Sequence, residues 1–373
     1  MQLDAELAAI IQPYGFDPAQ WEILRHRLRS QGYSPALNVI DGPIRAAQPG
    51  DIHPVPSEGT LERLRLECLG AAAIAKGEVA VLVLAGGMAT RFGGAVKGLV
   101  PVHHHLHFAE LKRRSVLHVA HQFQRAIPMW WMSSFLTHGP LTEWADAHED
   151  ERVPLSLFSQ STSLRLTEHG ELYRGSDPQD SVYCPGHGDT LTSLKRTSLP
   201  QEFKARGGRY IFMSNVDNLA ATLDPFIVGA HIDGGKRMTV ELVDKQPNDQ
   251  GGAPAWFNDT LQIIEAFRFP PTFDQTSIPV FNTNTFVFDV EVLQDAYPLD
   301  WFAVKKTAND SAVIQYEQLF GQLTAFIPGH YIRVEREGRQ SRFIPVKTPE
   351  DLEAQRPLIC EVLQARGVSI EAG

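Results

Sequence analysis

Two basic side chains lie among glycines directly after a strongly apolar run. Residues 79–102 read VAVLVLAGGMATRFGGAVKGLVPV, so Arg91 follows the glycine pair at 86–87 and Lys97 follows the pair at 93–94. Glycine lets a backbone approach a phosphate closely and present its N–H groups, and Arg and Lys add positive charge for the phosphate oxygens. The spacing fits neither the P-loop GxxxxGK[ST] nor the dinucleotide GxGxxG pattern. A purely structural turn is the alternative, but the two cations favour an anion-binding loop.

A carboxylate flanked by amides follows a second apolar run. Residues 209–215, RYIFMSN, predict a buried strand, and Asn215, Asp217 and Asn218 come at its carboxyl end. A hard carboxylate at such a point suits Mg²⁺, which prefers oxygen ligands and accompanies phosphates. A helix N-cap is the alternative role for this aspartate, and one residue can serve both ways. We therefore expect Mg²⁺ at Asp217.

The elements that must position these side chains are strands alternating with helices. Strand-like runs occupy 79–85, 129–135, 153–160, 209–215, 238–244, 261–267 and 283–290, and helical patterns occupy stretches such as 108–126, 141–148 and 348–367. Such alternation predicts an α/β domain whose mostly parallel sheet is covered on both faces. Ligands of such sheets bind beyond the carboxyl ends of the strands, which is where the glycine loop and Asp217 fall.

Composition limits the classes of function. The 373 residues are 43% hydrophobic and 21% charged, as in ordinary soluble globular proteins, and the formal net charge is −10. The sequence has no long Lys/Arg run of the kind that indicates nucleic-acid binding. No apolar run approaches the length of a membrane span. An early acid and no basic stretch precede the first apolar residues, so we expect no secretory signal. Three widely spaced cysteines, Cys68, Cys184 and Cys360, fit a reducing compartment. We expect a cytoplasmic protein, a monomer or small homo-oligomer.

The loop LAGGMATRFGGAVKG resembles the nucleotide-binding signature of the uridylyltransferases that make UDP-sugars, a group that includes UDP-glucose and UDP-N-acetylglucosamine pyrophosphorylases. The resemblance implies a loop that wraps the triphosphate of UTP, with its lysine on the phosphates. Ala89 stands where the family usually has glycine, and Val96 where it usually has proline. The nucleotide-binding positions implied in this loop are Leu84, Ala85, Gly86, Gly87 and Thr90. Arg91 and Lys97 are implied as catalytic residues, together with Lys347 near the C-terminus.

Two further segments resemble the family's base-binding region. LFSQ (157–160) matches a segment whose glutamine reads the uracil edge, and the amide of Gln160 offers the donor and the acceptor that the uracil imide needs. YCPGHGDTLTSL (183–194) is similar to a turn in which Gly186 would lie against the uracil and His187 would reach the sugar phosphate. The alternatives are a polar strand end for Gln160 and a structural loop residue for His187.

Three later motifs are similar to the family's sugar and phosphate contacts. VELVDKQPNDQGGAPAW (240–256) and FNTNTFVFD (281–289) imply hexose contacts, and SRFIPVKTPEDL (341–352) implies a lysine that reaches the phosphates. Thr285 replaces the usual second asparagine of the 281–289 turn. The implied roles are sugar binding for Asn215, Glu241, Gly251, Gly252, Asn282 and Asn284, nucleotide binding for Asn215, metal binding for Asp217 and phosphate binding for Lys347.

The resemblance implies a Rossmann-like nucleotidyltransferase fold, a three-layer sandwich with a mixed, mostly parallel central sheet. We expect an N-terminal helical segment and linker at 1–75, the catalytic domain at 76–345, and the lysine motif with a helix at 346–373; the C-terminal β-helix of the eukaryotic glucose enzymes is not expected. The implied reaction makes a UDP-sugar and pyrophosphate from UTP and a sugar 1-phosphate with Mg²⁺, glucose being favoured. N-acetylglucosamine or another modified hexose 1-phosphate is one alternative, and a non-catalytic nucleotide-sugar-binding protein is another.

Two conspicuous runs are interpreted as structural. HHHLH (103–107) has histidines that would alternate between the two faces of a strand, with no acid or cysteine nearby to complete a metal site. Trp130 and Trp131 lie in an apolar strand and are expected in the core rather than as a stacking platform.

Overall fold

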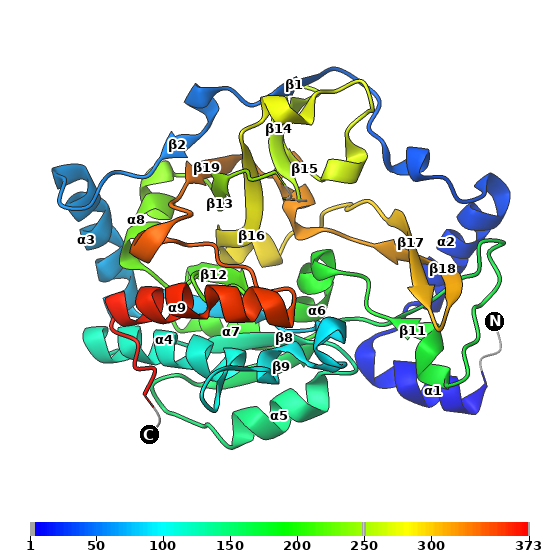
Figure 1. The fold of residues 1–373 in the computed structure, drawn as a ribbon, viewed down its shortest axis with the longest axis horizontal. Coiled ribbons are helices and arrows are strands. Elements are labelled where there is room, and N and C mark those ends of the chain that lie inside the picture. Colours follow the sequence, from blue (N-terminus) through cyan, green and yellow to red (C-terminus); the bar gives the residue numbers. More distant parts are fainter. Residues whose placement is uncertain (1–3, 248, 250, 372–373) are drawn as a thin grey trace.

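The computed structural model describes residues 4–247, 249 and 251–371 and is built around one eight-stranded sheet (Figure 1). The sheet order is β2 (His53–Pro54), β19 (Gly329–Arg333), β13 (Met238–Asp244), β16 (Val280–Asp289), β12 (Tyr210–Asn215), β3 (Val79–Leu84), β8 (Met129–Ser133) and β9 (Leu155–Ser159). Strand β16 runs antiparallel to both of its neighbours, and every other pairing is parallel. The expected mixed, mostly parallel sheet is confirmed.

Helices cover both faces of this sheet. Five helices pack on one face: α3 (Leu61–Lys76), α4 (Phe108–Phe123), α5 (His138–Asp146), α8 (Pro225–Gly234) and α9 (Pro349–Ala365). The opposite face is covered by α6 (Thr190–Lys195), α7 (Leu199–Ala205) and a second sheet. The result is a three-layer α/β sandwich, in agreement with the expected fold class.

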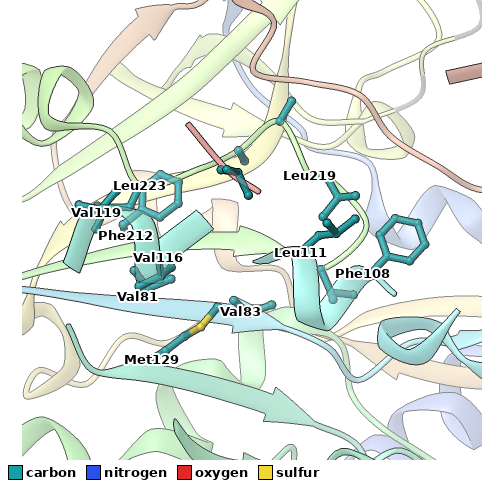
Figure 2. Close-up of a cluster of buried hydrophobic side chains, with 14 of the residues drawn as sticks. Val81, Val83, Phe108, Leu111, Val116, Val119, Met129, Phe212, Leu219 and Leu223 are labelled. Atoms are coloured by element: carbon teal, nitrogen blue, oxygen red, sulfur yellow. The ribbon is translucent and has the colours of Figure 1, made fainter. Parts of the chain in front are cut away.

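Alternate residues of β3 contribute to the two cores. Val81 and Val83 point into the core beneath α4, where they meet Phe212 of β12 and Met129 of β8 (Figure 2). Ala80, Leu82 and Leu84 point to the opposite core. Because both faces are buried, the strand reads as a continuous apolar run instead of an alternating one. Trp131 and Trp130 follow the same rule in β8 and lie in the two cores, as expected.

The apolar run at 261–267 does not join the central sheet. It forms β15 (Thr260–Ile264), which pairs with β14 (Ala253–Phe257), and β14 pairs in turn with β1 (Ile44–Ala46). Both of these pairings are antiparallel, and apolar side chains of β14 and β15 share a core with one face of the large sheet. Apolar periodicity predicts a strand but does not say which sheet it joins.

Helices α3 and α8 cross at very short distance. A Cβ atom on Gly70 would lie 1.8 Å from the carbonyl oxygen of Pro225, and one on Gly229 would lie 1.8 Å from that of Leu66. Glycine at both positions therefore lets the two backbones touch, which anchors α8 and the residues that precede it.

The N-terminal helices share a third core with distant segments. Helices α1 (Ala5–Ile11) and α2 (Pro18–Gln31) pack on the hairpin of β17 (Phe302–Ala308) and β18 (Ser311–Glu317), and on β10 (Ser163–Leu164) and β11 (Val182–Tyr183). Figure 1 shows this group at one end of the molecule. Two short hairpins complete the fold: β4 (Met88–Ala89) with β5 (Ala95–Val96), and β6 (Pro101–His103) with β7 (Leu106–His107). None of the helices in the described ranges is long and apolar enough to cross a membrane.

Candidate active site

The glycine loop leaves the carboxyl end of β3 and folds into the small β4–β5 hairpin. Gly93 and Gly94 close this hairpin with φ angles of 76° and 82°, a left-handed conformation that favours glycine. Thr90 and Arg91 are exposed near its tip. The loop is therefore held by regular pairing at its base while its polar side chains face outward.

The two unusual residues of the loop fit its backbone. Ala89 has a φ of −82°, is 5% exposed and packs in the core, so no glycine is required there. Val96 has a φ of −65°, which is the angle that a proline would impose. Both residues thus adopt ordinary negative φ angles, which alanine and valine take without strain.

Lys97 lies at the base of the loop against the C-terminal lysine motif. Its Nζ donates a hydrogen bond of 2.5 Å to the carbonyl oxygen of Val346, and it lies 4.5 Å from the ring centroid of Phe92. Burial lowers the pKa of Lys97, although the negative charges of Asp217 and Asp351 act in the opposite direction. The neighbouring Lys347 is exposed. The fold thus brings together two lysines that are 250 residues apart in the sequence.

Asp217 lies in the turn after β12, beside these lysines. Burial raises the pKa of its carboxyl group, and the charges of Lys97, Lys112 and Lys347 oppose that shift. Within the described part of the chain, the carboxylate accepts no hydrogen bond from any other residue. Asp224, and not Asp217, caps the following helix α8. The carboxylate is therefore available to a ligand.

These residues fit a magnesium ion that is carried largely by its substrates. Among the described residues there is no group of three or more His, Cys, Asp or Glu side chains that could hold a metal ion. Mg²⁺ commonly binds one or two protein carboxylates and completes its octahedron with water and phosphate oxygens. The Asp217 carboxylate, which lies beside Lys97 of the glycine loop, matches that mode.

Gln160 and Gly86 form a second part of the site. A Cβ atom on Gly86 would lie 2.7 Å from Nε2 of Gln160, so only glycine leaves the amide in place. Gln160 is 8% exposed, and its amide makes no hydrogen bond to another residue in the described ranges. Its donor and acceptor are both free to bind a ligand at the carboxyl end of β9.

His187 lies in a turn that packs against residues 317–320. Its Nδ1 accepts a hydrogen bond of 2.9 Å from the backbone N–H of Phe320, so Nε2 carries the proton of the neutral ring. Burial lowers the pKa of His187 to about 4. Gly186 and Gly188 permit this packing, because Cβ atoms there would lie 2.8 Å and 2.5 Å from backbone atoms of Gln318. His187 can therefore donate a hydrogen bond to an anion but adds no positive charge near neutral pH.

Three asparagines meet where β12 and β16 lie side by side. The Nδ2 of Asn284 donates to Oδ1 of Asn215 at 2.8 Å, and its backbone N–H donates to Oδ1 of Asn282 at 3.0 Å. Asn284 has a φ of 58°. Its own Oδ1 is buried without a partner among the described residues, and the carbonyl oxygen of Gly252 accepts from Asn282 N–H at 2.7 Å. The cluster thus contains a buried acceptor that no described residue satisfies.

Glu241 is the expected sugar-binding residue that the structure places elsewhere. Its neighbours Val240 and Leu242 point into the same core as the asparagine cluster, so the pleat of β13 turns Glu241 to the opposite face of the sheet. There it is 1% exposed and accepts two hydrogen bonds, of 2.6 Å and 2.7 Å, from the guanidinium of Arg342. Its carboxylate is engaged in a buried ion pair on the face of the sheet opposite to the asparagine cluster.

Comparison with known proteins shows the family of this chain. A family model described as UTP--glucose-1-phosphate uridylyltransferase matches residues 45–366. The chain belongs to this family.

Curated relatives of this uridylyltransferase-family chain bear the same description. The UTP--glucose-1-phosphate uridylyltransferase of Encephalitozoon cuniculi is 28% identical over 80% of this chain and 60% of its own length. That of Saccharomyces cerevisiae is 28% identical over 74% of this chain and 58% of its own length. The chain thus spans about 60% of the length of these relatives.

Solved structures similar to this family member support its fold. The uridine diphosphate N-acetylglucosamine pyrophosphorylase of Trypanosoma brucei aligns with a TM-score of 0.75 at 19% identity, covering 94% of this chain and 79% of that one. The T. brucei UDP-glucose phosphorylase aligns with a TM-score of 0.72 at 23% identity, over 95% and 79%. A Leishmania major UDP-glucose pyrophosphorylase mutant in complex with UDP-glucose aligns at 0.67 and 23%, over 94% and 79%.

Two buried side chains that support the uridylyltransferase-type site were not expected from the sequence in these roles. Asp189 accepts from Ser161 N–H at 2.5 Å and from Ser193 Oγ at 2.5 Å, which joins the 183–194 turn to the residue after Gln160. Asn218 accepts from Ile344 N–H at 3.0 Å and joins the Asp217 turn to the C-terminal motif. The sequence signal that could have indicated these supporting roles is proximity, since each residue lies within two positions of an expected site residue.

We expect the free energy of unfolding of His187→Asn to fall less steeply than that of wild type as the pH is lowered. The pKa of His187 is about 4 in the folded protein against 6.5 for an ordinary histidine, so between these values the unfolded chain binds more protons. Wild type should take up about one more proton than the variant on unfolding at pH 5. Urea denaturation from pH 4 to 7 measures this, and parallel curves for the two proteins would contradict it. Asparagine is the matched change because its Oδ1 can still accept from Phe320 N–H.

Proposed function

We propose that this protein transfers the uridylyl group of UTP to a sugar 1-phosphate and releases pyrophosphate, with glucose 1-phosphate as the sugar substrate. The observation that carries the proposal is the meeting of Lys97, Asp217 and the Lys347 motif at the carboxyl ends of β3 and β12. Glucose is preferred because the matching family and the curated relatives are described by glucose 1-phosphate.

The proposed reaction is a displacement at phosphorus. A phosphate oxygen of the sugar 1-phosphate forms a bond to the α-phosphorus of UTP, and the bond from that phosphorus to the oxygen bridging to the β-phosphate breaks. The protein supplies alignment of two anions and neutralisation of developing charge, with little covalent chemistry of its own. Mg²⁺ bound at Asp217 would contribute charge neutralisation and orientation of the phosphates.

Each phosphate-binding side chain has a separate task in this scheme. Arg91 and Lys97 hold the β- and γ-phosphates, and Gly87 and Thr90 of the same loop lie within reach of the triphosphate. Lys347 and His187 guide the sugar phosphate, Lys347 with a full charge and His187 with the N–H of a neutral ring. In this scheme Lys347 neutralises the charge of the sugar phosphate, and the N–H of His187 orients that phosphate through a hydrogen bond.

Base and sugar recognition fall to the neutral side chains. Gln160 reads the uracil edge from beside Gly86, with Leu84, Ala85 and Gly186 lining the base. The sugar hydroxyls bind at Asn215, Asn282, Asn284 and Gly252, and the hydrogen-bonded clustering of these residues supports the assignment.

Pyrophosphate release tests the proposal directly. The protein is incubated with Mg²⁺, each of the four nucleoside triphosphates in turn, and a panel of sugar 1-phosphates. We expect release with UTP and glucose 1-phosphate. Release with N-acetylglucosamine 1-phosphate or another hexose 1-phosphate instead would correct the sugar alone. No release with any pair, together with measurable binding of UDP-glucose, would identify a non-catalytic nucleotide-sugar-binding protein.

A further inference from the structure

A buried lysine that the proposed reaction does not use lies beneath the Asp217 turn. Lys112 belongs to α4 and is only 3% exposed. It stands in the charged run LKRRS but falls four residues after Phe108 and four before Val116, which places it on the apolar face of the helix. Figure 2 shows that this face packs on β3 and β12.

The ammonium group of Lys112 joins the two ends of the Asp217 turn. Its Nζ donates to Oγ of Ser214 at 2.9 Å and to the carbonyl oxygen of Ala221 at 2.7 Å. Ser214 is the residue before the last one of β12, and Ala221 lies seven residues further along the chain. Asp217 lies between these two residues in the sequence. Lys112, a residue of helix α4, therefore links the residues on either side of the Asp217 turn.

The ammonium group of Lys112 is buried among charged side chains of both signs. Burial lowers its pKa to about 7, the charges of Arg342 and Arg366 act in the same direction, and those of Asp217 and Glu241 oppose it. A methionine would fill a similar volume without the cost of removing an ammonium group from water. What lysine adds at this position is the pair of hydrogen bonds across the turn.

We propose that Lys112 is a positioning residue that holds the Asp217 carboxylate for Mg²⁺ by tying Ser214 to Ala221. The inference rests on the proposed function, in which Asp217 is the metal ligand. Groups that orient a metal ligand without touching the metal commonly change its affinity by about 10- to 100-fold when they are removed.

Metal binding, rather than turnover, tests this role. Lys112→Met and Ser214→Ala each remove one part of the tie, and titration calorimetry with Mg²⁺ in the presence of UTP should show an apparent Kd about tenfold higher for both. Binding of UTP in EDTA should stay within about twofold of wild type, because the base and loop contacts remain. The control is Lys204→Met, an exposed lysine of α7, which should change neither value.

The combined variants separate this inference from the proposed function. Lys112→Met with Ser214→Ala should bind Mg²⁺ no more weakly than Lys112→Met alone, whereas additive losses would overturn the tie. If Asp217→Asn weakens Mg²⁺ binding but Lys112→Met and Ser214→Ala do not, the inference fails and the ligand assignment stands. If Asp217→Asn has no effect, the ligand assignment fails. Ser214→Ala carries the test should Lys112→Met not fold.

Discussion

Replacing Lys97 with alanine is expected to lower kcat/KM at least about a hundredfold, equivalent to about 2.7 kcal/mol of transition-state stabilisation. The ammonium group is held by the carbonyl oxygen of Val346 and lies in the field of Asp217, so it is fixed before substrate arrives. A preorganised charge of this kind stabilises the charge that builds up on the departing pyrophosphate. Steady-state rates of pyrophosphate release with saturating Mg²⁺ measure the effect.

Two further variants show whether this loss reflects chemistry. Lys97→Met keeps a long unbranched side chain but removes the ammonium group that lies over the rings of Phe92 and Phe108, and it should lose activity to the same extent as Lys97→Ala. Lys204→Ala removes an exposed lysine and should keep wild-type rates. Near-normal activity of both Lys97 variants would contradict the proposed reaction. A lowered unfolding midpoint in Lys97→Ala but not in Lys97→Met would report the lost packing separately.

Replacing Glu241 with glutamine is expected to destabilise the fold by about 3–5 kcal/mol, because the buried guanidinium of Arg342 loses the carboxylate that it hydrogen-bonds and keeps only that of Asp224, 3.7 Å away. Arg342 is 5% exposed and donates through Nε and Nη2 to this one carboxylate. Although burial acts to lower the pKa of Arg342, the charge of Glu241 raises it overall. The free energy of unfolding in urea at neutral pH measures the loss.

The partner substitution distinguishes an ion pair from a sugar contact. Glu241→Met combined with Arg342→Met removes both charges and should recover most of the stability lost in Glu241→Gln. At a temperature where Glu241→Gln is folded, its KM for the sugar 1-phosphate should equal that of wild type. A small change in stability with a large rise in that KM would instead return Glu241 to the sugar site.

Local patterns were sufficient to predict most of the main sheet. The apolar runs at 79–85 and 209–215 became β3 and β12 because fully buried strands need no polar alternation. Glycines, cations and an aspartate after those strands indicated a loop after β3 and a turn at Asp217, since strand ends and loops have local sequence signals. The short strands β2 and β19 carry no such signal and were not predicted.

Pairing partners were beyond the reach of the sequence. Glu241 lies in a segment that resembles a sugar-binding strand, but the carboxylate meets an arginine 101 residues away, on the other face of the sheet. Lys112 reads as one charge in the surface-like run LKRRS, yet it bonds to Ser214 102 residues away. A side chain's burial depends on what packs over it, and that is set by the arrangement of the layers.

The sequence by itself determined which residue types lie in the glycine loop and at the strand ends, because residue type and spacing along a strand end are local properties. The tertiary structure alone decided that Lys97 rests on the Lys347 motif, that Gln160 lies against Gly86, and that Glu241 turns away from the asparagines. Those outcomes follow from the order of strands in the sheet and from the pleat of each strand. Both are fixed only when the whole core packs.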